Sequence, residues 1–333
     1  MKQAATLEEI YSPVEKRISQ VPETILSVLS TPNELAREAI GHFFSSPGKF
    51  LRPALTFFGA SIENPKSSTT LFEERLLRLG SAFEIFHSAT LIHDDIIDSA
   101  HLRRNISTLN AKWSPQVAVL VGDYLHDKAI GAIFSVENPR VTGLFLETAG
   151  TVCDGEIHEW REKNNFNLSE QEYFEIVRKK TASLIACSIE AGGILAGLAP
   201  EKTAALKRFG VGFGMAFQIV DDCLDFTGAE HEFGKTLGID FEGGVLTLPL
   251  IRLIELVDER TKGEVFKIFK SEIVGSRFET LKNRLREFET LDYAMARAQE
   301  FTDKARLELS IFPESGVRSS LERLLDYVLD RNR

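Results

Sequence analysis

Residues 91–98 read Leu-Ile-His-Asp-Asp-Ile-Ile-Asp, and residues 218–225 read Gln-Ile-Val-Asp-Asp-Cys-Leu-Asp. Both stretches contain the pattern DDxxD within an apolar run. Because side chains four residues apart share one face of a helix, the first and last aspartates of each pattern point the same way. Like charges at this spacing destabilise a helix by roughly a few tenths of a kcal/mol, and a bound cation would offset that cost.

The type of donor indicates which cation to expect. All-oxygen ligands suit Mg²⁺, which takes one or two carboxylates, several waters and substrate phosphates. One acidic pair is more often part of a solvated helix face, but these two motifs also share apolar neighbours. Shifting the first motif onto the second superposes Phe86 on Phe213, Ala89 on Ala216 and Ile92 on Ile219. We therefore expect two comparable helices that face each other across one cavity.

Basic residues are distributed around the two motifs. Lys49 and Arg52 lie three apart at a predicted helix start, where both can reach one anion with help from the helix N-terminus. The other basic candidates are Arg103, Arg104, Lys180 and Lys235. Any one of them is more often part of a solvated surface, but together they indicate a diphosphate site, because Arg binds phosphate bidentately and Lys supplies point charge. His87 lies two turns before Asp94 and is either a core histidine or a phosphate ligand.

Composition excludes several classes of protein. Of the 333 residues, 43% are hydrophobic, which argues against disorder, and the net charge of -10 argues against a nucleic-acid partner. Three scattered cysteines indicate a reducing compartment rather than a disulfide framework. We see no signal peptide and no apolar run long enough to cross a membrane, so we expect a cytoplasmic protein without stable membrane insertion.

Helix signals dominate the chain, and period-2 alternation is nearly absent, so we expect about a dozen helices and no sheet. Residues 31–34 form a predicted capping box with Pro at the first helical position, after a helix over 5–30. Asn138 and Ser169 are predicted to open further helices, the second running over 170–198. A glycine-rich stretch at 227–245 reads as a surface loop or as a mobile lid.

The motifs taken together resemble those of the trans-isoprenyl diphosphate synthases, the polyprenyl synthetase family. The matching segments are GKFLRP at 48–53, FHSATLIHDDIIDSAHLRR at 86–104, VGDYL at 121–125, GE at 155–156, KTASL at 180–184, FQIVDDCLDF at 217–226, GK at 234–235 and TLPLI at 247–251. The resemblance implies an all-α fold, a single large helical domain over residues 1–333 around a deep central cavity, usually as a homodimer. It also implies Mg²⁺ as cofactor and two substrates, isopentenyl diphosphate and an allylic diphosphate.

The resemblance assigns a role to each matching residue. The metal ligands or their near neighbours are Asp94, Asp95, Asp98, Asp221 and Asp225, while Asp222 belongs to the motif with a less direct role. The allylic diphosphate is contacted by Arg103, Lys180, Gln218 and Lys235. Isopentenyl diphosphate is held by Lys49, Arg52, His87 and Arg104. Thr181 and Gln218 face the allylic carbon. The six aspartates together with Lys180, Thr181, Gln218 and Lys235 form the expected catalytic set.

Product length depends on the residues one turn before the first motif, because the growing chain runs away from the aspartates. In short-chain members of the family one or both are bulky, but here they are Ala89 and Thr90. We therefore expect a long product, in the hexaprenyl to decaprenyl range, made from a primer such as farnesyl diphosphate and handed over at a membrane. A geranylgeranyl or farnesyl diphosphate synthase is the alternative. The tunnel floor is expected at Ile130, Ile133 or Phe134.

Two positions depart from the family pattern. Val245 stands where many members have Lys, and Glu159 stands where many have Gln. These changes leave open a weaker or partner-dependent catalyst, and the alternative of another class is a non-catalytic subunit of a heteromeric synthase. A terpene cyclase usually lacks the second DDxxD motif and the basic GKxxRP motif, and both are present here.

Overall fold

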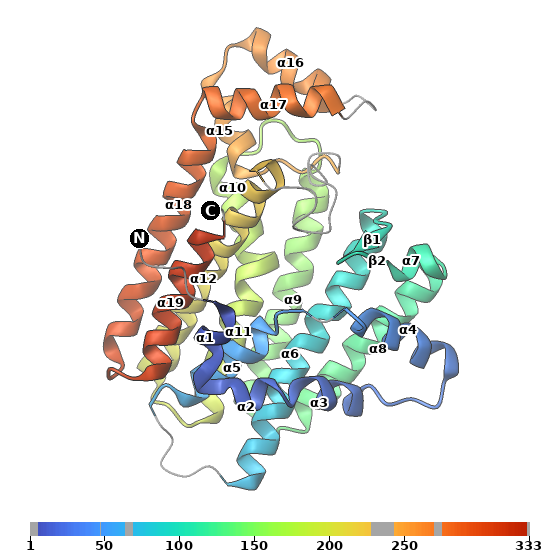
Figure 1. The fold of residues 1–333 in the computed structure, drawn as a ribbon, viewed down its shortest axis with the longest axis vertical. Helices are drawn as coiled ribbons and strands as arrows, with labels where there is room; N and C mark the ends of the chain where they lie inside the picture. The colour runs from blue at the N-terminus through green and yellow to red at the C-terminus, as the bar shows by residue number, and fades with distance from the viewer. Residues whose placement is uncertain (1–5, 47, 64–68, 228–242, 270–274, 332–333) are drawn as a thin grey trace.

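The two aspartate motifs lie on two long helices that determine the architecture. The computed structural model describes residues 6–46, 48–63, 69–227, 243–269 and 275–331. Helix α6 (Thr70–Ile97) carries the first motif and helix α12 (Pro200–Thr227) carries the second, each near its C-terminal end. Both helices run toward the upper end of the molecule in Figure 1, so the two motifs lie at the same end of the bundle. The all-α prediction is confirmed.

Other helices surround this pair. Helix α6 packs on α8 (Pro115–Phe134), and α12 packs on α18 (Thr290–Glu308). Helix α11 (Ser183–Leu195) lies between α5 (Leu51–Ser61) and α12, and it also contacts α9 (Pro139–Glu162). Much of the phenylalanine surplus fills the resulting core. The largest fully buried rings are those of Phe57, Phe58, Phe83, Phe86, Phe145, Phe209, Phe213, Phe226 and Phe312.

The N-terminal region corrects two predictions. The expected helix over 5–30 is divided into α1 (Leu7–Tyr11), a 3-10 turn η1 (Ser12–Val14), α2 (Glu15–Ile18) and α3 (Val21–Val28). Pro13 and Pro22 each stand at the start of a new element, because proline cannot continue a helix from its interior. The capping box at Thr31 is wrong. Asn33 caps α4 (Glu34–Phe44) by accepting from the backbone of Ala36, which leaves Pro32 outside the helix.

The predicted helix starts at Asn138 and Ser169 are confirmed, since both side chains accept backbone N–H groups of the helices that follow. The expected helix over 170–198 is interrupted. It consists of α10 (Glu170–Val177), a π-helical turn η2 (Arg178–Ala182) and α11. A small antiparallel ribbon of β1 (Leu102–Arg103) and β2 (Ile106–Ser107) follows α6 and precedes α7 (Leu109–Lys112).

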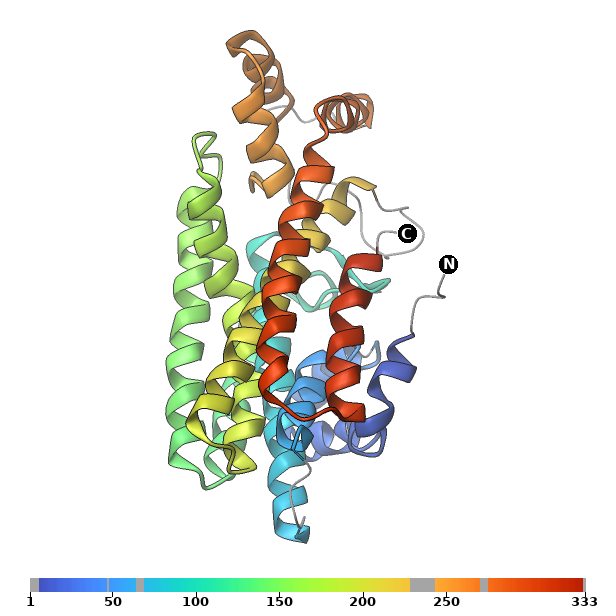
Figure 2. The same ribbon diagram turned by 90° about the vertical axis from the view of Figure 1, so that its left-hand side faces the viewer.

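The C-terminal third closes the bundle. Helices α15 (Leu248–Leu256), α16 (Glu259–Phe269) and α17 (Gly275–Glu287) form a smaller apolar cluster above the main core. Helix α18 continues through η3 (Leu309–Ile311) and returns as the antiparallel α19 (Gly316–Asp330), which is visible in Figure 2. None of the helices in the described ranges combines the length and apolar character that a membrane crossing demands.

Candidate active site

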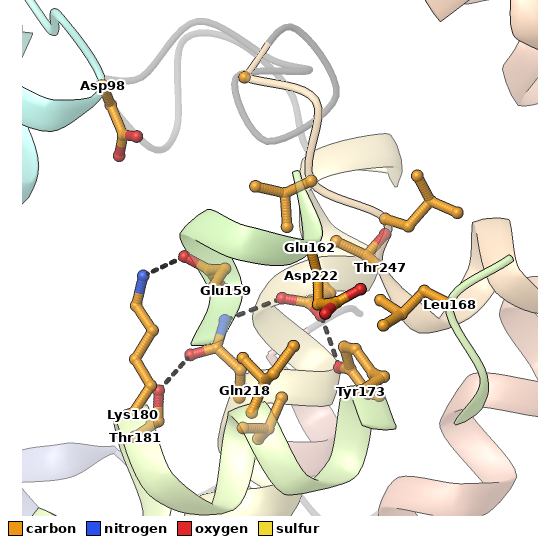
Figure 3. Close-up of a pocket in the computed structure, with 15 residues that line it drawn as sticks. Asp98, Glu159, Glu162, Leu168, Tyr173, Lys180, Thr181, Gln218, Asp222 and Thr247 are labelled. Atoms are coloured by element: carbon orange, nitrogen blue, oxygen red, sulfur yellow. Dashed lines mark hydrogen bonds and ion pairs between the residues drawn. The ribbon is translucent and has the colours of Figure 1, made fainter. Parts of the chain in front are cut away.

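A pocket with a cavity volume of about 100 Å³ lies among residues of α9, α10 and α12 (Figure 3). Five predicted site residues line it, namely Asp98, Lys180, Thr181, Gln218 and Asp222. The remaining lining residues are Glu159, Glu162, Leu168, Tyr173, Ile176, Val177, Gly243, Val245, Leu246 and Thr247. The structure therefore brings together residues from both aspartate motifs and from the KTASL segment.

Lys180 is held between two carboxylates of α9. Its Nζ lies 2.9 Å from Glu156 and 2.5 Å from Glu159. This approach requires Gly155, because a Cβ there would lie 2.6 Å from the Lys180 backbone nitrogen. Burial alone would lower the pKa of Lys180, but Glu159, Glu156 and Asp94 together raise it well above its usual value. Burial raises the pKa of Glu156 to about 7. Lys180 is thus a charged group whose counter-charges a phosphate can replace.

A chain of hydrogen bonds orients Gln218 (Figure 3). The Thr181 hydroxyl donates to Gln218 Oε1 over 2.9 Å, and Gln218 Nε2 donates to Asp222 Oδ1 over 2.8 Å. The Tyr173 hydroxyl donates to the other oxygen of Asp222 over 2.6 Å. Because a carboxylate only accepts, Asp222 fixes the amide of Gln218 with its nitrogen inward and its oxygen toward Thr181. Asp222, which is 3% exposed, therefore serves as a positioning group.

The three aspartates of the first motif have different surroundings. Asp95 is buried and is bound by Arg103, whose Nε lies 2.9 and 3.0 Å from its two oxygens. Asp98 lies 3.2 Å from Nζ of Lys163, at the end of α9. Burial raises the pKa of Asp94 to about 6, from an ordinary value of 3.8. Arg103, predicted as a phosphate contact, is thus placed at the first motif by its pair with Asp95.

The second motif is also paired with a basic side chain of the protein. Arg331, at the end of α19, places Nη2 2.8 Å from Asp221 Oδ1 and stacks over the Phe217 ring at 4.7 Å. Asp225 lies one turn further along α12 and is half-buried. Among the described residues, no three His, Cys, Asp or Glu side chains form a complete metal cage.

The donor set nevertheless fits Mg²⁺. The first and last aspartates of both motifs supply oxygen ligands, and Asp98 and Asp221 each already attract a cationic side chain. Mg²⁺ commonly uses one or two carboxylates and completes its shell with water and substrate phosphate. Asp94, Asp98, Asp221 and Asp225 are the residues that would hold it.

The second group of basic residues gathers around His87 of α6. Arg52, Arg103 and Arg104 act together with burial to lower the pKa of His87 well below its usual value, with burial as the largest cause. Arg104 Nη1 also donates to the backbone oxygen of Ser46 over 2.9 Å, just before the GKFLRP segment. Lys49 lies over the ring of Tyr327, at 5.9 Å from its centroid. These residues form a second positive region, which Arg103 connects to the first motif, as expected for a second anion.

The predicted chain-length residues do not line the pocket. Ala89 is 1% exposed within the core, and the Thr90 hydroxyl donates to the backbone oxygen of His87 over 2.8 Å. Among the expected floor residues, Ile133 is buried, but Phe134 is 57% exposed and does not suit a tunnel floor. Lys235 and most of the glycine-rich stretch, 228–242, lie outside the described residues.

Several functional candidates were not predicted from the sequence. Lys163 and Arg331 were missed because their acidic partners are distant in sequence. Tyr173 follows a helix cap and carries no motif. Glu84 could have been found from the sequence, because it is an acidic residue within the apolar run around Phe83. It is 6% exposed, and burial raises its pKa, while Arg52 and Arg104 act in the opposite direction.

Comparison with known proteins identifies the family of this chain. A sequence model of the family described as "Polyprenyl synthetase" matches residues 33–280. The chain is 32% identical over 326 residues to heptaprenyl diphosphate synthase component 2 of Geobacillus stearothermophilus, covering 98% of this chain and 99% of that protein. It is 32% identical over 327 residues to an all-trans-nonaprenyl-diphosphate synthase (geranyl-diphosphate specific) of Rhodobacter capsulatus, covering 97% of this chain and 98% of that protein.

Comparison with solved structures indicates the same family. The crystal structure of polyprenyl synthase from Caulobacter crescentus CB15, complexed with calcium and isoprenyl diphosphate, superposes with a TM-score of 0.93. The two chains share 28% sequence identity, and the alignment covers 100% of each. The resemblance stated from the sequence motifs is therefore confirmed. This chain is a prenyltransferase and belongs to the polyprenyl synthetase family.

Proposed function

We propose that the protein is an Mg²⁺-dependent enzyme that condenses isopentenyl diphosphate with an allylic diphosphate, such as farnesyl diphosphate, to give a long-chain polyprenyl diphosphate. The observation that carries this proposal is the pairing of two anion sites at one end of the bundle. One contains Lys180, Thr181 and Gln218 beside both aspartate motifs. The other contains His87 with Arg52, Arg103 and Arg104. Because Arg103 acts on both Asp94 and His87, two diphosphates held in these adjoining regions would bring an allylic carbon and an alkene together.

The residues of the pocket suit the ionisation step. Bound Mg²⁺ would neutralise the diphosphate and stabilise the charge that develops as it leaves. Lys180 can exchange its contacts with Glu156 and Glu159 for phosphate oxygens. Thr181 and Gln218 place neutral oxygen atoms side by side, 2.9 Å apart, on the same wall. Neutral dipoles of this kind stabilise a carbocation without capturing it.

The later steps need little more from the protein. The double bond of isopentenyl diphosphate attacks the allylic carbon, and the new tertiary cation then loses a proton to form the product double bond. The departed diphosphate is a suitable acceptor for that proton, because it is anionic and remains beside the cation. The surrounding apolar side chains, Leu168, Ile176, Val177 and Leu246, exclude water during this period.

Product length follows from the small residues before the first motif. Ala89 is buried in the core, so the growing prenyl chain can pass it only if neighbouring side chains move. A Phe at this position would fill that space. The names of the two relatives, a heptaprenyl and a nonaprenyl synthase, support a long product. A geranylgeranyl or farnesyl diphosphate synthase is the alternative.

A homodimer is part of the proposal. Helices α8 and α9 pack together and expose large apolar side chains, which a dimer interface would remove from water. These are Val119, Leu120, Phe134, Leu146, Ile157 and Trp160. Size-exclusion chromatography with light scattering should give the mass of a dimer for the parent protein. Leu120→Lys should shift it toward the monomer, and a monomeric parent protein would contradict this part.

The reaction is tested by incubating the purified protein with Mg²⁺, labelled isopentenyl diphosphate and geranyl, farnesyl or geranylgeranyl diphosphate. Chromatography of the dephosphorylated products should show chains of six to ten isoprene units. Since one relative is named a component 2, the second candidate is a subunit that needs a partner chain. Failure to incorporate label with every primer would favour that candidate and would contradict the proposed homodimeric enzyme.

A further inference from the structure

Lys163 lies at a point where the pocket wall lacks an expected charge. It follows α9 directly, and its side chain is only 14% exposed, which is unusual for a lysine. Its Nζ lies 3.2 Å from Asp98 Oδ1 and 4.5 Å from the centroid of the Trp160 ring. The ion pair and the ring together hold the ammonium group beside Asp98, which lines the pocket.

Lys163 is also close to the position of Val245, where many members of the family have lysine. The backbone N–H of Asn164 donates to the carbonyl of Gly244 over 2.8 Å. Gly244 has φ +77°, and a Cβ there would lie 2.7 Å from Asn164 Oδ1, so only glycine allows this contact. Because residue 164 is bonded to residue 244, Lys163 and Val245 flank the same junction.

Val245 itself lines the pocket but offers no charge. A diphosphate bound through Mg²⁺ to the first motif would be near Asp98, and therefore near the ammonium group that Asp98 now attracts. Asp98 would serve such an ion as a ligand, and Lys163, without its counter-charge, would then be available to a phosphate oxygen.

We propose that Lys163 is a binding residue for the diphosphate of the allylic substrate and that it supplies the positive charge absent at Val245. This inference rests on the proposed function and deepens it. It concerns one substrate only, because Lys163 pairs with Asp98 of the first motif, whereas Arg52 and Arg104 act on Glu84 and His87. A lysine that merely neutralises Asp98 would compete with the metal ion, so its removal would leave the affinity for farnesyl diphosphate unchanged or increase it.

The test measures both substrates separately. Lys163→Gln should raise KM for farnesyl diphosphate by about tenfold to a hundredfold, as expected for one charge-assisted contact, and leave KM for isopentenyl diphosphate within about twofold. Binding of farnesyl diphosphate with Mg²⁺, measured by calorimetry without isopentenyl diphosphate, should weaken by the same factor. Lys163→Arg, which keeps the charge, should remain within about threefold of the parent protein.

A double variant tests whether a positive charge at position 245 can replace the one at position 163. Adding Val245→Lys to Lys163→Gln should restore most of the affinity for farnesyl diphosphate, because the new ammonium group enters from the same junction. The matched control is Lys202→Gln, at the start of α12. It also removes one part-buried lysine from an ion pair, with Glu63, but lies outside the pocket.

The outcomes separate this inference from the proposed function. A parent protein that neither binds farnesyl diphosphate with Mg²⁺ nor incorporates label would contradict the proposed function itself. An active parent protein with an unchanged KM in Lys163→Gln would overturn the inference. So would an equal effect on both substrates, or a double variant that stays as weak as the single one.

Discussion

Substitution of Asp222 by Asn tests whether the middle aspartate of the second motif positions Gln218 or binds metal. In the structure Asp222 accepts from Gln218 Nε2 over 2.8 Å and from Tyr173 over 2.6 Å. The carboxylate therefore allows only one orientation of the Gln218 amide. An asparagine side chain can donate or accept, so Gln218 could turn its oxygen away from Thr181.

The size of the effect follows from these contacts. A hydrogen bond to a charged group contributes about 1.5–3 kcal/mol, and each 1.4 kcal/mol corresponds to about a factor of ten. We expect kcat to fall by about tenfold to a hundredfold. For 333 residues, an unfolding entropy of about 2.1 cal/mol/K per residue gives about 0.7 kcal/mol/K. The same loss should therefore lower Tm by about 2–4 °C.

The assay is incorporation of labelled isopentenyl diphosphate at a series of MgCl₂ concentrations. Asp222→Asn should keep its half-saturating Mg²⁺ concentration within about twofold of the parent protein, while Asp221→Asn should raise it more than about tenfold. Tyr173→Phe should lower Tm like Asp222→Asn but reduce kcat less, because Gln218 keeps its charged partner. The reasoning is refuted if Asp222→Asn increases the Mg²⁺ requirement as strongly as Asp221→Asn.

Three further predictions concern single residues. Ala89→Phe should shorten the product and, by overpacking a site that is 1% exposed, cost about 1–3 kcal/mol of stability; an unchanged product length on chromatography would contradict the tunnel. Burial raises the pKa of Asp94 to about 6, so metal-free stability should fall as pH rises from about 4 to 6. The increase in Tm caused by MgCl₂ should correspondingly shrink as pH falls from 7 to 5, and a constant increase would count against Asp94 as a ligand. Arg331→Gln should lower the half-saturating Mg²⁺ concentration, because Arg331 neutralises Asp221. A higher half-saturating concentration would contradict this and would show that Arg331 supports metal binding.

The helices and side chains that could be predicted from the sequence are those that depend on residues close together in the chain. The DDxxD motifs lie on long helices whose apolar residues recur with helical spacing, so the two helices and the aspartates at their ends could be expected. The caps at Asn138 and Ser169 depend on contacts with residues two or three positions away, and both were confirmed.

The errors have local physical reasons as well. Two candidate caps compete before α4, and Asn33 prevails over Thr31 because its side chain reaches the backbone of Ala36. The π-helical turn at Arg178–Ala182 leaves no mark on helical periodicity. Gly155 of α9 approaches this turn closely, and only the folded chain reveals that contact.

The pairs that complete the site could not be predicted, because their partners are far apart. Lys163 is 65 residues from Asp98, and Tyr173 is 49 residues from Asp222. Each pair forms because the fold brings the two helices that carry its members together near one end of the bundle. Which residues meet there depends on helix lengths and crossing geometry rather than on any motif.

The central claim is that both aspartate motifs serve one reaction at one end of the bundle. Its most direct test compares incorporation of labelled isopentenyl diphosphate into farnesyl diphosphate by the parent protein, Asp94→Ala and Asp221→Ala at saturating Mg²⁺. Loss of a metal contact worth about 4 kcal/mol in the transition state corresponds to about a thousandfold, so each variant should lose at least that much activity while remaining folded. Retention of activity within about tenfold of the parent protein by either variant would contradict the account.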